Sequence, residues 1–208
     1  MEEFKRLSRD LVAHGAIIDY YQDTIKVPNG NIAKWDFIKH NGAAAVVPVD
    51  AQGRLIMVKQ FRNALDRYTI EIPAGGLQNP MEPTRDAAAR ELSEETGYTS
   101  DHLELLLSIR TTVAFCNEKI DIYVADHLVP GQQHLDEDEF VQTAAYTVEE
   151  LTRMIYAGEI QDSKTVAAIL AYKDKYLKYQ ILNRQCIAAS CFSYICRKAI
   201  TGGEYGKR

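Results

Sequence analysis

Four charged residues near the middle of the chain, Arg90, Glu91, Glu94 and Glu95, have the types and spacing of a divalent-cation site. On a helix, at about 100° per residue, Glu91 and Glu95 lie roughly 40° apart, and Glu94 falls roughly 60° to the other side of Glu91. All three carboxylates can therefore face one ion. Such hard oxygen ligands favour Mg²⁺, with Mn²⁺ as the alternative, over Zn²⁺, which prefers His or Cys.

The segment from 84 to 96 must position these carboxylates, and its composition predicts a helix. It is rich in Ala, Arg, Leu and Glu, follows Pro83 and stops at Gly97. The glutamates then occupy the last turns, where the helix dipole disfavours negative charge. A cation would relieve that repulsion, with Arg90 fixing one carboxylate while others bind the metal. A solvated acidic helix face is the alternative interpretation.

The residues that flank the cluster carry a family resemblance. Gly76, five residues, Glu82, seven residues and then RELSEETGY at 90–98 match the pattern GX5EX7REUXEEXGU at every fixed position, with Tyr98 replacing the final aliphatic residue. The chain therefore resembles the Nudix hydrolases. The resemblance implies an α/β fold, an α/β/α sandwich with a mixed sheet, that hydrolyses a diphosphate linked to another moiety. Gly76 would let backbone approach the phosphates, and Glu82 would support the acidic cluster.

Upstream residues resemble one branch of that family, the ADP-ribose pyrophosphatases. EIPAG at 71–75 resembles the element in which the Ala carbonyl is a metal ligand, a role that would fall to Ala74. Arg62, which ends the apolar segment from 55 to 61, becomes a candidate substrate contact, or else an ordinary surface arginine. Trp35 would stack on adenine with Asp36 beside it as a polar contact, although a lone Trp is more often part of a core.

Downstream the resemblance weakens in one loop. Val113 and Ala114 occupy the positions where the branch usually carries proline and glycine, which puts its substrate preference in doubt. Glu118 is a candidate substrate contact. The acidic run 135–140 resembles a loop that supplies a glutamate to the metal or to the attacking water. Glu139 is the first choice and Glu137 the second, against the alternative of a solvated acidic loop.

The function that these features favour is metal-dependent hydrolysis of ADP-ribose to AMP and ribose 5-phosphate. The catalytic set would be Glu94, Glu95 and Glu139, and the metal ligands would be Ala74, Glu91, Glu94 and Glu95. One alternative is a nucleotide-sugar diphosphatase that prefers ADP-glucose or GDP-mannose. Another is a non-catalytic sensor of ADP-ribose, although the glutamates are intact and no basic helix-turn-helix is evident.

Composition limits the partners that we expect. The chain has 208 residues, 46% hydrophobic and 25% charged, and a net charge of −5, which argues against binding nucleic acid through its phosphates. We see neither a signal peptide nor an apolar run of about 20 residues, so a cytoplasmic protein that does not enter membranes is expected. Its four cysteines are predicted to be reduced thiols, and its five histidines show no metal-ligand spacing.

Three segments are predicted along the chain. Residues 1–41 form a short helix or coil followed by an N-terminal antiparallel sheet, with strands at 16–21, 24–27 and 32–40. By resemblance this sheet would contribute to a homodimer and to substrate contacts. Residues 42–179 form the Nudix domain, with further strands at 43–49, 55–61, 103–110, 119–125 and 141–146 and helices at 148–157 and from 162 or 163. Residues 180–208 are an extension of unknown role.

Overall fold

The structure is a computed structural model that describes residues 3–135, 137 and 139–177. The extension at 180–208, with three of the cysteines, lies outside the described residues. The chain divides into two compact units, residues 1–169 and 170–208. The second unit is described only over the end of helix α3 (Ser163–Tyr172) and the π-helical turn Lys173–Leu177.

Three antiparallel strands, β1 (Lys5–His14), β2 (Asp19–Lys26) and β3 (Ile32–Lys39), form the N-terminal sheet in the order β1-β2-β3. The sheet was predicted, but its first strand was not, because residues 5–14 were expected to be helix or coil. The predicted break near residue 23 is also wrong. Asp23 sits within β2, where Arg9 of β1 binds both its carboxylate oxygens at 2.7 and 2.6 Å. That pair lets a buried Asp occupy a strand.

A mixed four-stranded sheet forms the centre of the unit, in the order β7 (Ala74–Gly76), β4 (Ala43–Pro48), β10 (Lys119–Ala125) and β9 (Leu103–Arg110). The β4 and β10 strands are parallel, and the other pairs are antiparallel. Every residue of β4 is buried, as expected for a short apolar run inside a sheet. A second sheet, β12 (Gln142–Tyr146), β5 (Leu55–Arg62) and β6 (Arg67–Glu71), is antiparallel. A 3₁₀ turn, Asn63–Leu65, joins β5 to β6.

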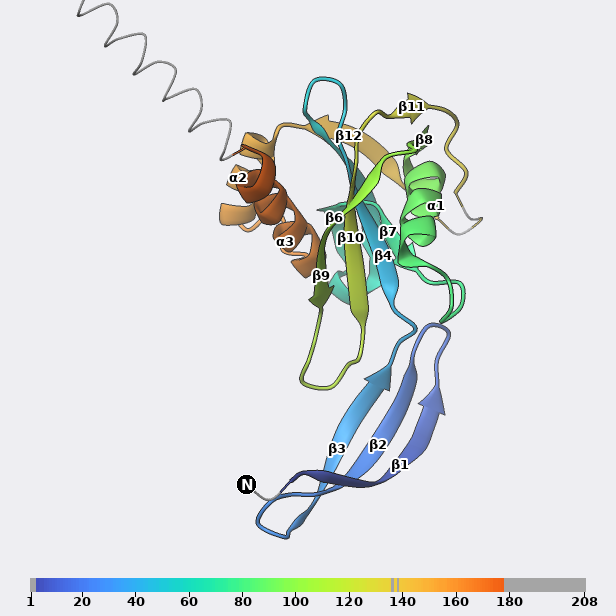
Figure 1. Ribbon diagram of the computed structural model, residues 1–208, viewed down its shortest axis with the longest axis vertical. Helices are drawn as coiled ribbons and strands as arrows, with labels where there is room; N and C mark the ends of the chain where they lie inside the picture. The colour runs from blue at the N-terminus through green and yellow to red at the C-terminus, as the bar shows by residue number, and fades with distance from the viewer. Residues whose placement is uncertain (1–2, 136, 138, 178–208) are drawn as a thin grey trace, which may run out of the picture. The chain divides into compact units, whose positions relative to one another are not determined.

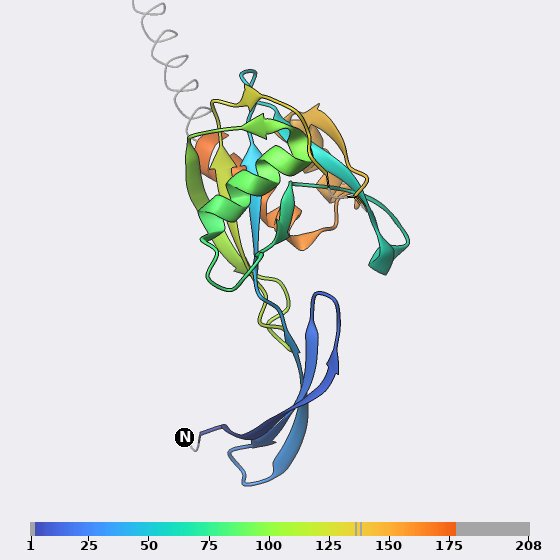
Figure 2. The ribbon, with the colours of Figure 1, turned by 90° about the vertical axis from the view of Figure 1, so that its right-hand side faces the viewer.

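Helices flank these sheets. Helix α1 spans Thr84–Thr96, as predicted, and α2 (Val148–Tyr156) begins with a capping box between Thr147 and Glu150. Figure 1 shows α1 and α2 on opposite sides of the sheets, and Figure 2 shows α1 lying across the sheet face. The predicted α/β fold with a mixed sheet is confirmed. One core cluster joins α1 to β4, β9 and β10 and consists of Ala44, Val46, Ala87, Ala88, Leu92, Leu103, Tyr123 and Ala125.

Two short connections complete the frame. The ribbon of β8 (Tyr98–Thr99) and β11 (Val129–Pro130) follows the end of α1. At the end of β3, Ile38 forms an isolated bridge with Cys116, and the His40 amide donates to Asn117 Oδ1 at 2.8 Å. These contacts join the N-terminal sheet to the loop between β9 and β10.

Candidate active site

The last turns of α1 place three glutamates where they were predicted to lie. The side chains of Glu91 and Glu95, one turn apart, are buried, with residue exposures of 7% and 1%. Glu94 is more open, with 38% of its side chain exposed. Apolar neighbours on the same helix, such as Leu92, pack into the core and thereby fix which way the glutamates point. The helix ends at Gly97, whose φ of 72° is the left-handed conformation that glycine adopts readily.

Arg90 holds the cluster together. Its Nη1 donates to Glu91 Oε1 at 2.6 Å and to Glu94 Oε2 at 2.9 Å, and its Nε donates to Glu82 Oε1 at 3.3 Å. Its Nη2 donates to the Gly76 carbonyl at 3.1 Å. The guanidinium thus ties two glutamates of α1 to the loop before the helix and to strand β7. Arg90 was predicted to fix one carboxylate, whereas it contacts two glutamates of α1 and Glu82 as well.

Strand β7 closes the other side of the site. The Ala74 amide donates to Glu95 Oε2 at 2.9 Å, which places the Ala74 backbone directly beside that carboxylate. Gly75 lies against Glu91 so closely that an added Cβ would overlap Glu91 Oε1 and lie 2.7 Å from Oε2. Gly75 had no predicted role, and only the absence of its side chain makes room for Glu91. By contrast, an added Cβ at Gly76 would meet nothing within 4 Å.

The buried carboxylates are electrostatically strained. Burial raises the pKa of Glu91 to about 7 despite the favourable charge of Arg90, and the charges of Glu94 and Glu139 add to the rise. Burial also raises the pKa of Glu95 to about 8, helped by Glu91 and Glu139 and opposed by the Ala74 amide. Desolvated carboxylates that repel one another favour a bound cation. These oxygen donors therefore fit a hard divalent metal.

The acidic loop contributes one nearby residue. Glu139 is half-buried and close enough to raise the pKa of both Glu91 and Glu95. Glu137 is exposed and is not among the main causes of either shift. Two hydrogen bonds anchor the residues just before this run to α1. The His134 amide donates to the Glu94 carbonyl at 3.0 Å, and the side-chain Nε2 of Gln133 donates to the Glu95 carbonyl at 2.5 Å. Of the two candidates in the loop, Glu139 has the clearer electrostatic effect on the cluster, and its role in catalysis stays a prediction.

A cavity of about 540 Å³ adjoins the site. Its lining includes three predicted substrate contacts, Arg62, Gly76 and Glu118, together with Ala74. Glu118 accepts from Thr111 Oγ1 at 2.5 Å, and His40 Nδ1 lies 3.6 Å from its other oxygen. The cavity therefore brings the predicted contacts of strands β5 and β7 and of the β9–β10 loop to one place.

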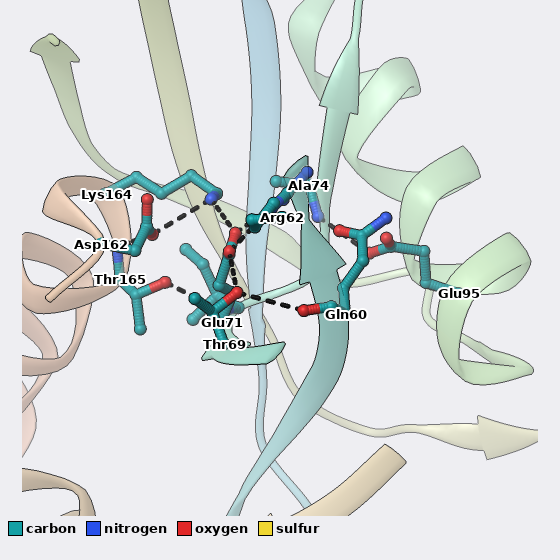
Figure 3. Close-up of polar contacts among 10 residues, drawn as sticks. Gln60, Arg62, Thr69, Glu71, Ala74, Glu95, Asp162, Lys164 and Thr165 are labelled. Atoms are coloured by element: carbon teal, nitrogen blue, oxygen red, sulfur yellow. Dashed lines mark hydrogen bonds and ion pairs between the residues drawn. The ribbon is translucent and has the colours of Figure 1, made fainter. Parts of the chain in front are cut away.

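Glu71 binds two cationic side chains that line this cavity, Arg62 and Lys164, and Figure 3 shows these contacts. Arg62 donates to both its oxygens at 2.8 and 2.6 Å, Thr69 Oγ1 donates at 2.6 Å, and Lys164 Nζ also pairs with it. Burial alone would raise the pKa of Glu71, but the Arg62 and Lys164 contacts outweigh it and lower the pKa to about 2. Arg62 contacts Glu71 through Nε and Nη2, so its Nη1 takes no part in this ion pair.

Two predicted substrate contacts lie elsewhere. Trp35 and Asp36 line a different cavity of about 660 Å³, with Ala114 and Phe115 from the β9–β10 loop. Trp35 is 48% exposed, and its ring centroid lies 5.8 Å from that of Phe4. Asp36 accepts from Tyr20 Oη at 2.7 Å. Within one chain the structure does not bring these residues into the cavity beside the glutamates.

Sequence reasoning missed three contributors: Gly75, Glu71 and Lys164. Two of them, Glu71 and Gly75, belong to the EIPAG element, which drew attention only to Ala74. Lys164 follows Asp162, whose side chain caps α3 by accepting from the Thr165 amide at 2.9 Å. That capping pattern was a usable signal for the helix start, but nothing local indicated that Lys164 would reach Glu71, 93 residues away.

An α/β fold with buried helix carboxylates beside a cavity lined by cationic side chains fits the class of cation-assisted hydrolases of phosphate compounds. A family model described as NUDIX domain matches residues 39–169. The chain therefore belongs to the Nudix family. None of the described helices is long and apolar enough to cross a membrane.

Two relatives agree with this assignment, and one solved structure agrees with the fold. The chain is 39% identical over 169 residues to an ADP-ribose pyrophosphatase of Bacillus subtilis, covering 80% of this chain and 91% of the relative. It is 37% identical over 180 residues to a methanol dehydrogenase activator of Bacillus methanolicus, covering 86% and 94%. A crystal structure of an ADP compounds hydrolase matches with a TM-score of 0.76 at 20% identity, covering 86% and 97%, which supports the fold.

Proposed function

We propose that this protein is a divalent-metal-dependent hydrolase that cleaves the diphosphate of ADP-ribose to AMP and ribose 5-phosphate. The observation that carries the proposal is the glutamate cluster of α1 packed against Ala74 and Gly75, next to a cavity with Arg62 on its wall. The similarity to a relative named ADP-ribose pyrophosphatase points the same way.

Glu91, Glu94, Glu95 and the Ala74 carbonyl are the groups that we expect to hold the metal, with Mg²⁺ as the first choice and Mn²⁺ as the alternative. A bound divalent ion neutralises diphosphate charge and lowers the pKa of a coordinated water. Arg90 keeps Glu91 and Glu94 oriented through its two short contacts. Charged groups that are already oriented in a site that excludes water stabilise the transition state more than the same groups would in water.

Other residues of the site would activate the water and bind the diphosphate. Glu139 is the residue that we expect to accept the proton of the attacking water, since it lies beside the buried carboxylates. Arg62 and Lys164 present positive charge to the cavity, where the diphosphate would bind. Gly76, without a side chain, leaves room for phosphate oxygens at the cavity wall.

We also propose that two copies of the chain act as a homodimer. The N-terminal sheet exposes several large apolar side chains: Phe4, Leu7, Leu11, Val12, Ile17, Ile32 and Trp35. Large apolar side chains exposed in this number favour burial against a partner. A partner's site is also where Trp35 and Asp36 could meet the substrate, because their own cavity is separate from the glutamates. Light scattering should give twice the chain mass; a monomeric mass contradicts this part. A cytoplasmic location stays a prediction.

A substrate panel tests the proposed specificity. ADP-ribose, ADP-glucose and GDP-mannose are each incubated with the protein and Mg²⁺ or Mn²⁺, and the nucleoside monophosphate released is quantified. We expect the highest kcat/KM for ADP-ribose. A higher value for either nucleotide sugar would favour the nucleotide-sugar diphosphatase alternative. Binding of ADP-ribose without turnover of any substrate would favour a sensor.

The similarity to the methanol dehydrogenase activator favours a second candidate function, activation of a methanol dehydrogenase. Methanol oxidation by a purified methanol dehydrogenase is followed with and without this protein. A rate increase that disappears in Glu95→Gln would link activation to the glutamate cluster. An unchanged rate would leave ADP-ribose hydrolysis as the function.

A further inference from the structure

Two histidines and an aspartate converge at one end of the β9–β10 strand pair. His102 Nδ1 lies 2.5 Å from Asp126 Oδ1, and His127 Nδ1 lies 3.3 Å from the same oxygen. Over the described ranges 3–135, 137 and 139–177, these three form the only group of His, Cys, Asp or Glu ligands whose atoms all lie within 4.8 Å of one another. The more widely spread glutamates of α1 do not meet this criterion.

The backbone sets the positions of these side chains. His102 immediately precedes β9 and Asp126 immediately follows β10, and Leu103 of β9 pairs with Ala125 of β10. Ser100 Oγ donates to the Asp126 carbonyl at 2.6 Å and accepts from the His102 amide at 3.0 Å, which ties the two segments together. His127 has a φ of 50°, a conformation that residues other than glycine adopt rarely. Three possible metal ligands therefore lie together on backbone segments that hydrogen bonds hold in place.

We propose that His102, Asp126 and His127 form a binding site for a transition-metal ion, Zn²⁺ or Ni²⁺. Two imidazole nitrogens and one carboxylate oxygen suit these ions, whereas Mg²⁺ prefers oxygen ligands alone. Zinc bonds of about 2.0–2.1 Å in a tetrahedron put neighbouring donors about 3.3 Å apart. The separation of His127 from Asp126 already has this value, and His102 needs to move away from Asp126 by less than about 1 Å. The exposed imidazoles leave room for water as a fourth ligand.

The site lies at the end of the β9–β10 pair that is remote from the catalytic cavity. Thr111 and Glu118, which follow β9 and precede β10 at the other end, line that cavity. Eight residues of strand at about 3.3 Å each separate the two ends by roughly 25 Å. The metal would thus act as a cross-link between residues 100–102 and 126–127, not as a reactant. Ligand binding to the folded state alone raises stability, so the midpoint of thermal unfolding should rise.

Calorimetric titration with Zn²⁺ tests the proposal, in excess Mg²⁺ to occupy the glutamates. The full chain carries Cys186→Ser, Cys191→Ser and Cys196→Ser, because cysteines of the 180–208 segment are zinc ligands by type. We expect one Zn²⁺ per chain and a higher unfolding midpoint. Loss of a residue that only hydrogen-bonds to a metal ligand lowers metal affinity by about 10- to 100-fold. The double variant His102→Ala with His127→Ala removes two ligands, so its affinity for Zn²⁺ should fall by more than this.

Two further variants make the test specific. Asp126→Asn keeps both imidazoles and should weaken Zn²⁺ binding without changing the circular dichroism spectrum. His14→Ala is the matched control, because His14 forms a comparable pair with Asp19 at 2.7 Å but belongs to no three-ligand group among the described residues. It should bind Zn²⁺ as the parent does. Absence of Zn²⁺ binding in the parent, or equal binding by the parent and the double histidine variant, would overturn the proposal.

Discussion

Gly75→Ala is the substitution whose effect the structure defines most closely. The new Cβ would overlap Glu91 Oε1 and lie 2.7 Å from Oε2, whereas non-bonded atoms are normally about 3.5 Å apart. The Glu91 carboxylate would have to retreat by roughly 1 Å or more. It is buried, and its Oε1 accepts a 2.6 Å hydrogen bond from Arg90, so it cannot retreat without losing that contact.

The size of the effect follows from this displacement. A misplacement of about 1 Å at a catalytic group lowers the rate by about 10²-fold. Loss of the Arg90 contact would cost a further ~1.5–3 kcal/mol of stability, the range for hydrogen bonds to charged groups. We therefore expect kcat for AMP release to fall by about 100-fold, with weaker Mg²⁺ protection against thermal unfolding.

Gly76→Ala is the matched control, because its added Cβ meets no atom within 4 Å. It should leave folding and Mg²⁺ protection unchanged. Since Gly76 lines the cavity, the added methyl group should raise KM while kcat stays within a few-fold of the wild type. Steady-state kinetics and thermal unfolding with and without Mg²⁺ measure both variants. A Gly75→Ala enzyme with wild-type kcat and Mg²⁺ protection would refute the packing argument.

Three other predictions concern the ion pair of Glu71, the base and the adenine contact. Glu71→Gln should lower the free energy of unfolding at pH 7 by ~3 kcal/mol, because the pKa of Glu71 falls from 4.5 to about 2 at about 1.4 kcal/mol per unit. Because folding lowers the pKa of Glu71, the stabilisation from its carboxylate is present above about pH 4.5 and is lost as the pH falls toward 2. Urea denaturation across this pH range should therefore show a smaller loss of stability on acidification in the variant than in the wild type. Equal stabilities of the two proteins at pH 7 would contradict the ion-pair account. Glu139→Gln should lower kcat by about 10²–10⁴-fold, whereas Glu137→Gln should keep a kcat near that of the wild type. If steady-state kinetics give the reverse order, Glu137 is the general base instead. Trp35→Ala should raise the KM for ADP-ribose by about 5- to 150-fold at constant kcat, because stacking of a base on an aromatic ring contributes ~1–3 kcal/mol to binding. An unchanged KM would show that Trp35 does not stack on adenine.

Local patterns made α1 and its cluster predictable. The residues of 84–96 favour helix, Gly97 ends it, and the spacing of Glu91 and Glu95 puts them on one face. The buried strand β4 was equally clear, because its six residues are continuously apolar except for a final proline. These elements depend on interactions between residues that are close in sequence, and a single chain's sequence contains that information.

Long-range contacts account for what was missed or mispredicted. Strand β1 depends on pairing with β2 and on Arg9 binding Asp23, 14 residues away, so its own polar sequence gave a helix or coil prediction. His102 and His127 are 25 positions apart, and only the pairing of β9 with β10 brings them together. Spacing along the chain therefore gives no sign of this three-residue group, because the contact between its members is made by strand pairing.

The measurement that tests the central claim most directly is AMP release from ADP-ribose by the wild type and Glu95→Gln, each with Mg²⁺ and with a chelator. Glu95 is buried against the Ala74 amide, and its amide analogue keeps the size of the side chain while removing its charge. We predict Mg²⁺-dependent formation of AMP by the wild type and a rate at least about 100-fold lower for the folded variant. Equal rates for the two proteins, or AMP formation that is unaffected by the chelator, would contradict the account.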